Sequence, residues 1–238
     1  MQPMVRACAL ALLLAQCAFA RADSYDLGSF RLALIDDPVR VEFQKGAAVP
    51  TPDNLQQVIR IAAATRGWRV ATQADGRMEL INVVRDHTMS VELVYDETGY
   101  RLRYLQSTNL LYAAKGGNLR VIHKNYNEWL NELVLAINGG LQLPAQTTKG
   151  FAPVAKIDAV PYVNERGRGA YQEFLGMPNP RAFAIAPNGS WGRAVRLRPG
   201  ARGDVAEDAL ERCNRRGEGQ CRVYAIDGHV VWTAASDR

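Results

Sequence analysis

The sequence is poor in cysteine and histidine, the residues that most often build metal and covalent sites. It holds four cysteines and three histidines in 238 residues. Cys8 and Cys17 lie in the apolar N-terminal segment, so only Cys213 and Cys221 remain for the folded protein. A structural zinc site needs about four cysteine or histidine ligands close together. We therefore expect no metal site.

Long apolar runs are also absent. No run reaches the roughly 20 residues that a membrane-spanning helix needs, so we expect no retained transmembrane span. The apolar run at 7–15 follows Arg6 and precedes Ala18-Phe19-Ala20, which is typical of a cleaved secretory signal. Residues 1–20 are therefore predicted to be a signal peptide, and the mature protein is expected to be periplasmic or secreted.

Two other outcomes at the N-terminus stay open. Cleavage after Ala22 also fits, because Ala20 and Ala22 are both small. Leu14-Ala15-Gln16-Cys17 is similar to a bacterial lipobox, although that motif has a small residue where Gln16 stands. A lipid-anchored envelope protein acylated at Cys17 is the second choice of location.

An excess of one charge is missing as well. The formal net charge is +5, and removal of Arg6 with the signal lowers it by one. Nucleic-acid-binding proteins usually gather basic residues into a dense stripe, which is not seen here, so we expect no nucleic-acid partner. With 47% hydrophobic and 22% charged residues, the composition is that of a globular protein.

Motifs for catalysis or nucleotide binding do not occur. Gly116-Gly117 lacks the spacing and the following lysine of a phosphate loop. Ser190 lacks the glycine spacing of a hydrolase nucleophile elbow. Asp36-Asp37 are neighbours in turn-like sequence and are assigned to a solvated turn, because adjacent carboxylates do not face each other across a scissile bond. We therefore expect no cofactor and assign no catalytic residue.

Periodicity predicts an α+β fold for residues 25–140. Apolar spacing indicates helices over 54–66 and 124–138, and alternation with an Asp75-Gly76 turn indicates strands between them. These form an antiparallel four-stranded meander sheet with two flanking helices. One or two further strands are expected before them, at 30–35 and 39–43. The meander strands are expected at 68–73, 78–85, 88–95 and from Tyr100 to about Tyr104.

The rest of the chain is predicted to be a linker and a small module. Prolines without a sustained pattern indicate a linker at 141–179. Residues 180–238 are expected to form a small α+β module, with two short strands, a helix that starts at Asp204, and a hairpin across Asp227-Gly228. In an oxidising compartment, Cys213 and Cys221 are expected to form one disulfide.

Two stretches resemble exported proteobacterial proteins and lipoproteins of uncharacterised function. The first runs from Tyr104-Leu105-Gln106-Ser107-Thr108-Asn109-Leu110-Leu111-Tyr112 to Ile122-His123-Lys124-Asn125-Tyr126-Asn127-Glu128-Trp129. The second is similar to a Trp-Gly, Ala-Leu-x-x-Cys, Cys module of secreted bacterial proteins, on Trp191-Gly192, Ala209-Leu210-Glu211-Arg212-Cys213 and Cys221. The resemblance supports the division into two units and implies no function.

Polar residues between the last strand and the second helix are one candidate binding region, because such connections often carry binding residues. His123 is either a base or a group at a helix start or core edge. The candidate residues are Ser107, Asn109, Tyr112, His123, Tyr126 and Asn127.

Arginines form the second candidate region. Between Phe174 and Gly203 there is no acidic residue, and arginine side chains suit carboxylates and phosphates. The alternative is a solvated strand edge on which arginines discourage pairing with other strands. The arginines of this region are Arg181, Arg193, Arg196, Arg198 and Arg202.

These features favour an exported, non-enzymatic envelope protein that binds a protein partner or an anionic lipid or glycan. A small periplasmic hydrolase or transferase that uses the His123 region is the alternative. A structural accessory of a surface assembly is a third interpretation, which differs in having one fixed partner.

Overall fold

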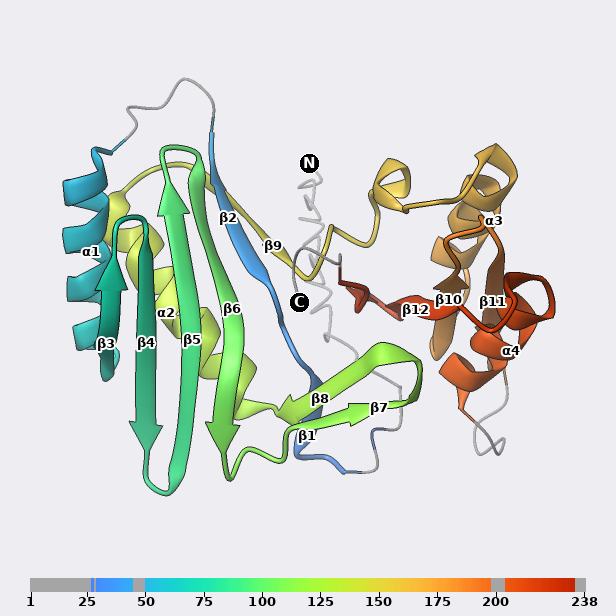
Figure 1. The fold of residues 1–238 in the computed structure, drawn as a ribbon, viewed down its shortest axis with the longest axis horizontal. Coiled ribbons are helices and arrows are strands. Elements are labelled where there is room, and N and C mark those ends of the chain that lie inside the picture. Colours follow the sequence, from blue (N-terminus) through green and yellow to red (C-terminus); the bar gives the residue numbers. More distant parts are fainter. Residues whose placement is uncertain (1–26, 28, 45–49, 198–203, 234–238) are drawn as a thin grey trace, which may run out of the picture.

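The computed structural model describes residue 27 and residues 29–44, 50–197 and 204–233. Within these residues the chain forms three antiparallel sheets and four α-helices (Figure 1). The predicted signal peptide and its alternatives at Cys17, Ala20 and Ala22 lie outside the described residues, as do Arg198 and Arg202. No helix in the described ranges has the length and apolar character needed to span a membrane.

The largest sheet has six strands, so the prediction of a four-stranded sheet is wrong although the structure is α+β. The meander forms as neighbours, but two further strands extend it beyond β6. In spatial order the strands are β3 (Trp68–Ala74), β4 (Arg77–Val84), β5 (His87–Asp96), β6 (Gly99–Thr108), β2 (Val39–Phe43) and β9 (Ala145–Lys149).

The added strands pair over long sequence distances. Val39 and Val41 are buried while Arg40 is half-exposed, the alternation of a strand with one face in a core. Gly99 lets β2 approach β6, because a Cβ at Gly99 would overlap the carbonyl of Val41. β9 at the sheet edge is mostly polar, so its sequence carries no such alternation.

Two helices cover one face of this sheet (Figure 1). α1 (Pro52–Thr65) begins at Thr51, whose hydroxyl accepts a hydrogen bond from the N–H of Asn54. α2 (Asn125–Leu141) lies beside α1. Their buried stripes, Leu55, Ile59, Ala62 and Ala63 on α1 and Tyr126, Leu130, Leu133, Val134 and Ile137 on α2, join the strands in one core.

A three-stranded sheet lies between the large sheet and the C-terminal module. Its strands in spatial order are β1 (Leu32–Leu34), β8 (Leu119–His123) and β7 (Ala113–Lys115). Leu34, Leu119 and Val121 belong to the same apolar cluster as Val205, Ala209 and other residues of the C-terminal module. The two predicted units therefore share a core at this sheet.

The C-terminal module is built on one four-stranded sheet. In spatial order its strands are β11 (Trp191–Val195), β10 (Arg181–Ile185), β12 (Arg222–Ile226) and β13 (His229–Val230). Ala182 and Ala184 join the apolar cluster of α4 (Val205–Gly217), whereas Phe183 and Ile185 join that of α3 (Glu165–Leu175). The sheet is thus covered on both faces. The range predicted as a linker contains both β9 and α3, and the domain boundaries themselves stay a prediction.

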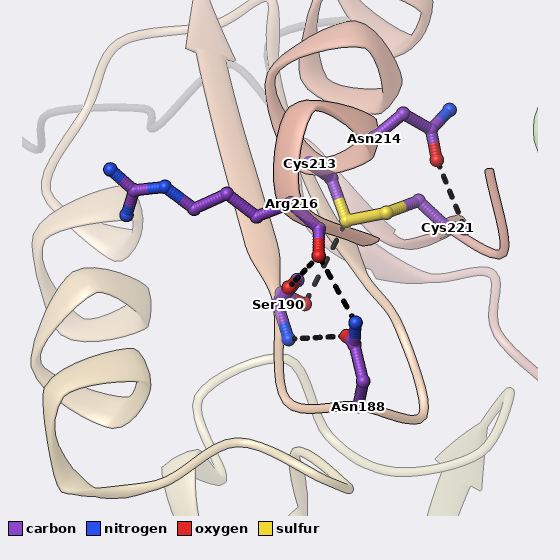
Figure 2. The surroundings of a disulfide bond; sticks show 6 residues. All are labelled: Asn188, Ser190, Cys213, Asn214, Arg216 and Cys221. Atoms are coloured by element: carbon purple, nitrogen blue, oxygen red, sulfur yellow. Dashed lines mark hydrogen bonds between the residues drawn. A yellow bond between two sulfur atoms is a disulfide. The ribbon is translucent and has the colours of Figure 1, made fainter. Parts of the chain in front are cut away.

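The predicted disulfide is confirmed. Cys213 near the end of α4 is bonded to Cys221 just before β12, with the two Cα atoms 6.1 Å apart. Figure 2 shows the bond beside the turn of Asn188 and Ser190. Both side chains donate to the carbonyl of Arg216 at the end of α4, over 3.1 Å and 2.9 Å. Ser190, which the sequence excludes as a nucleophile, therefore caps a helix end.

Candidate functional site

His123 lies at the end of β8 and faces a second histidine. The rings of His87 and His123 are stacked with centroids 6.0 Å apart, and Trp129 lies 6.2 Å from His87. His87 donates from Nδ1 to the carbonyl of Asn109 over 2.9 Å, and the Asn109 amide donates to the carbonyl of Asp86. Asn109 thus joins the turn before β5 to the segment after β6.

The surroundings of His123 favour the neutral form of its ring. Its Nδ1 accepts a hydrogen bond from the N–H of Asn125 at 3.2 Å, which leaves the proton of the neutral ring on Nε2. Burial lowers the pKa of His123, and electrostatic interaction with His87, Arg31 and Lys124 lowers it further. In the described part of the chain, no carboxylate, hydroxyl or thiol forms a hydrogen bond with this ring, and its hydrogen bond is to the backbone N–H of Asn125.

Three of the predicted site residues meet around Tyr104 on β6. Tyr112 stacks on the ring of Tyr104 at 4.6 Å, and Tyr126 meets it edge to face at 5.7 Å. The hydroxyls of Tyr104 and Ser107 are 3.0 Å apart. Burial raises the pKa of Tyr126 well above its ordinary value, so this phenol stays protonated. Sequence reasoning placed Tyr104 on a strand face and did not assign it to this cluster.

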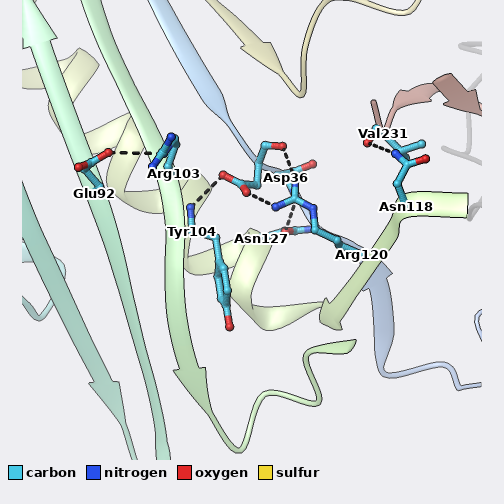
Figure 3. A network of polar contacts seen from close by, with 9 residues as sticks. Asp36, Glu92, Arg103, Tyr104, Asn118, Arg120, Asn127 and Val231 are labelled. Carbon is cyan, nitrogen blue, oxygen red and sulfur yellow. Dashed lines mark hydrogen bonds and ion pairs between the residues drawn. The ribbon is translucent and has the colours of Figure 1, made fainter. Parts of the chain in front are cut away.

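The side chain of Asn127 joins α2 to the end of β1 and the residues after it by two hydrogen bonds. Its side-chain oxygen accepts from the N–H of Asp36 at 3.0 Å, and its amide donates to the carbonyl of Leu34 at 2.8 Å. Lys149 on β9 pairs with the Asp36 carboxylate at 2.6 Å. Both contacts of Asn127 are therefore with the protein's own backbone, and Figure 3 shows Asn127 beside Asp36.

The Asp36-Asp37 pair is buried, which corrects its assignment to a solvated turn. The two residues are 7% and 8% exposed. The Asp37 carboxylate pairs with Arg120 at 2.5 Å and accepts from the N–H of Tyr104 at 2.9 Å. Burial raises the pKa of Asp37, while the Arg120 guanidinium acts in the opposite direction. Turn-like composition gave no signal of this burial, because Arg120 is 83 residues away along the chain.

The described members of the arginine region bind acceptors of the protein itself. Arg181 donates to the carbonyls of Phe174, Leu175 and Met177, which are the last acceptors of α3 and the turn after it. Arg193 pairs with Glu173, and Arg196 pairs with Asp208 at 2.8 Å. Binding of an external anion by these arginines stays a prediction, and their contacts give each a structural role.

A pocket of about 350 Å³ opens on the C-terminal module beside the disulfide. Sequence reasoning did not find it, because its walls come from four separate segments. Tyr162 forms one side and is 54% exposed. Trp232, from the end of the described chain, lies behind it with ring centroids 6.2 Å apart. The walls consist of Tyr162, Ile185, Pro187, Gly219, Gln220, Cys221, Arg222 and Trp232.

Two polar side chains at this pocket remain available for a ligand. Gln220 and Arg222 are exposed, and within the described residues neither side chain forms a hydrogen bond or ion pair. This distinguishes Arg222 from Arg181, Arg193 and Arg196. The pocket combines an aromatic wall with a free guanidinium and a free amide, which is the usual make-up of a small-molecule site.

Comparison with known proteins adds no relative. No family model, curated protein or solved structure matches this chain. The resemblance to exported proteins of uncharacterised function therefore stays a prediction, and function must be argued from the geometry alone.

Proposed function

We propose that this chain is an exported, non-enzymatic protein of the bacterial envelope that binds an anionic envelope component. Binding takes place in the pocket of the C-terminal module. The observation that carries the proposal is the free Arg222 beside the exposed ring of Tyr162. Export is supported by the signal-like pattern before Ala20, together with a disulfide that oxidising compartments favour.

The anion belongs at Arg222 because other arginines nearby are engaged. A guanidinium already paired with the protein gains little from an external carboxylate, since that ligand has to replace an existing partner. Arg222 needs no such exchange. It stands at the start of β12, and its neighbour Cys221 is fixed by the disulfide, so the site is held in place before a ligand arrives.

The alternative of a hydrolase that uses His123 has less support. A histidine base needs a substrate or nucleophile within hydrogen-bond reach, and the Nδ1 atom is occupied by a backbone N–H. We expect His123→Ala to fold and to leave any hydrolytic activity of the preparation unchanged. A hydrolytic activity that disappears in this variant without loss of folding would replace our proposal with the enzyme.

Binding is tested with the mature protein and a panel of envelope chemistries. The panel holds acidic saccharides, acidic peptides and anionic phospholipid vesicles, each with a neutral counterpart, and binding is followed by calorimetry and by tryptophan fluorescence. We expect an anionic member to bind, and its affinity to fall at least tenfold in Arg222→Gln. Arg168→Gln, which removes an exposed arginine of α3 in the same module, is the matched control. No binding by any anionic member, or equal binding by Arg222→Gln, would overturn the proposed function.

A further inference from the structure

We propose that the pocket of Tyr162, Trp232 and Arg222 is a site for an acidic saccharide, with one pyranose ring on the aromatic wall and its carboxylate on Arg222. This inference rests on the proposed function and names the ligand class of the same site.

The aromatic wall is built for stacking. Tyr162 has φ of 68°, a left-handed conformation that non-glycine residues rarely adopt, and its side chain is exposed. The ring of Trp232 packs edge to face against the ring of Tyr162. It also packs edge to face against the ring of Phe151, with the two centroids 4.6 Å apart. An exposed aromatic ring fixed in this way offers a flat apolar face to the C–H groups of a sugar ring, while its hydroxyl stays in water.

Gln220 and Arg222, at the rim of the pocket, are polar groups of the kind that a sugar acid requires. The Arg222 guanidinium offers parallel N–H donors that match a carboxylate. The Gln220 amide both donates and accepts, which suits neighbouring hydroxyls on one ring. A neutral sugar would leave the guanidinium without a charged partner. Arg222 and Gln220 together therefore favour a sugar that carries a carboxylate.

The rim is preorganised by bonds on both of its sides. The Cys213–Cys221 disulfide fixes the segment of Gln220, and the N–H of Cys221 donates to Asn214 at 3.2 Å. On the other side, Asn188 and Ser190 attach the turn after Pro187 to the end of α4 (Figure 2). A rim that does not reorganise loses little entropy on binding, which favours small ligands with few contacts.

A peptide is a poorer occupant than a saccharide. Peptides that bind beside a sheet usually add a strand to an open edge. β10 has no open edge at the pocket, because Ile185 pairs with Trp191 on one side and with Arg222 on the other. β13 pairs with β12 at Ala225 and Ile226 and not at Arg222, so only a short length of β12 is open beside the pocket. The volume of about 350 Å³ is also at the low end for ligand pockets, which suits one or two sugar rings.

The test compares three probes on the full mature protein by calorimetry. The probes are trigalacturonic acid, the neutral maltotriose and a capped Glu-Glu dipeptide. We expect the uronic acid to bind at least tenfold more tightly than either of the others. Tyr162→Asn, which removes the ring but accepts the left-handed backbone, should lower that affinity at least tenfold, whereas Tyr162→Phe should keep it.

The variants of Arg222 separate charge from stacking. Arg222→Gln should lower the affinity for trigalacturonic acid at least tenfold, and Arg168→Gln should leave it unchanged. Dipeptide binding without uronic acid binding would overturn the saccharide inference and leave the proposed function standing. Binding of the uronic acid that Tyr162→Asn does not weaken would also overturn the inference. If none of the acidic probes binds, and no anionic member of the wider panel does, the inference and the proposed function both fail.

Discussion

The six-stranded sheet is covered by helices on one face, whereas the four-stranded sheet of the C-terminal module is covered on both. The first core is filled by large side chains such as Met78, Leu80 and Leu93. The second is filled toward α4 largely by alanines and toward α3 by aromatic rings. A core of large side chains depends on volume, whereas a core of alanines depends on close approach of the backbones.

Close approach makes the C-terminal module intolerant of added atoms. A Cβ at Gly192 on β11 would overlap the Ala209 carbonyl and the Cys213 N–H of α4. We expect Gly192→Ala to lower the free energy of unfolding by about 4 kcal/mol, because rigid backbone atoms have to move apart. Thermal denaturation measures the change. Gly169→Ala on α3, where a Cβ meets no atom within 4 Å, should be neutral or stabilising. Equal losses in both variants would contradict this difference.

The stability of the large sheet should instead depend on its buried ion pair between Asp37 and Arg120. Asp37→Ala leaves Arg120 without its carboxylate and the Tyr104 N–H without an acceptor. We expect a loss of about 3–4 kcal/mol in the free energy of unfolding, measured by urea denaturation. Glu132→Ala on the exposed face of α2 serves as the control and should change stability by less than about 0.5 kcal/mol. A small effect of Asp37→Ala would show that the pair adds little to the core.

The disulfide gives the module a covalent link that the described part of the large sheet does not have. Cys213→Ser should lower the free energy of unfolding by about 2–3 kcal/mol, because the bond closes a short loop and constrains the unfolded chain. Hydrogen exchange measured by mass spectrometry should show faster exchange in α4, β12 and the adjoining β8. The exchange of β4 and β5 should stay unchanged. Faster exchange in β4 and β5 as well would mean that the two regions unfold as one unit.

The smallest expected effect is on how the melting temperature changes between pH 7 and pH 5.5. The pKa of His123 is lowered in the folded protein, so the unfolded chain binds a proton more readily below about pH 6.5. Its contribution to stability is complete above that pH and is lost as the pH falls through the folded pKa. The melting temperature should therefore decrease less between pH 7 and pH 5.5 in His123→Gln than in the wild type. Identical pH profiles would exclude His123 as the titrating group.

Local patterns in the sequence predicted the strands β3 to β6 of the large sheet better than the added strands β2 and β9. The hairpins from β3 to β6 pair with immediate neighbours, so alternation and an Asp-Gly turn were sufficient signals. β2 and β9 pair over long distances, and β9 has no apolar alternation. α3 escaped detection because Gly167 and Gly169 interrupt its pattern, although Asn164 caps its start through the N–H of Gly167.

The candidate site was predictable only where its residues are close in sequence. Ser107 and Tyr112 lie near Tyr104 along the chain and meet it in space. The partner of His123 could not be predicted, because β5 brings His87 beside it from 36 residues earlier. Tyr162 and Trp232 are separated by 70 residues, and only the folded module places their rings together.

The position of β2 between β6 and β9 has a consequence for the order of folding. β2 precedes both partners in the chain, so it has no strand to pair with until β6 is available, and it is not paired on both sides until residues up to Lys149 are available. The local hairpins from β3 to β6 close over much shorter loops and are expected to form earlier, because loop closure costs less entropy at short range. Until β2 arrives, the backbone of β6 is an unpaired edge. This interval is when pairing with another chain competes most strongly with folding.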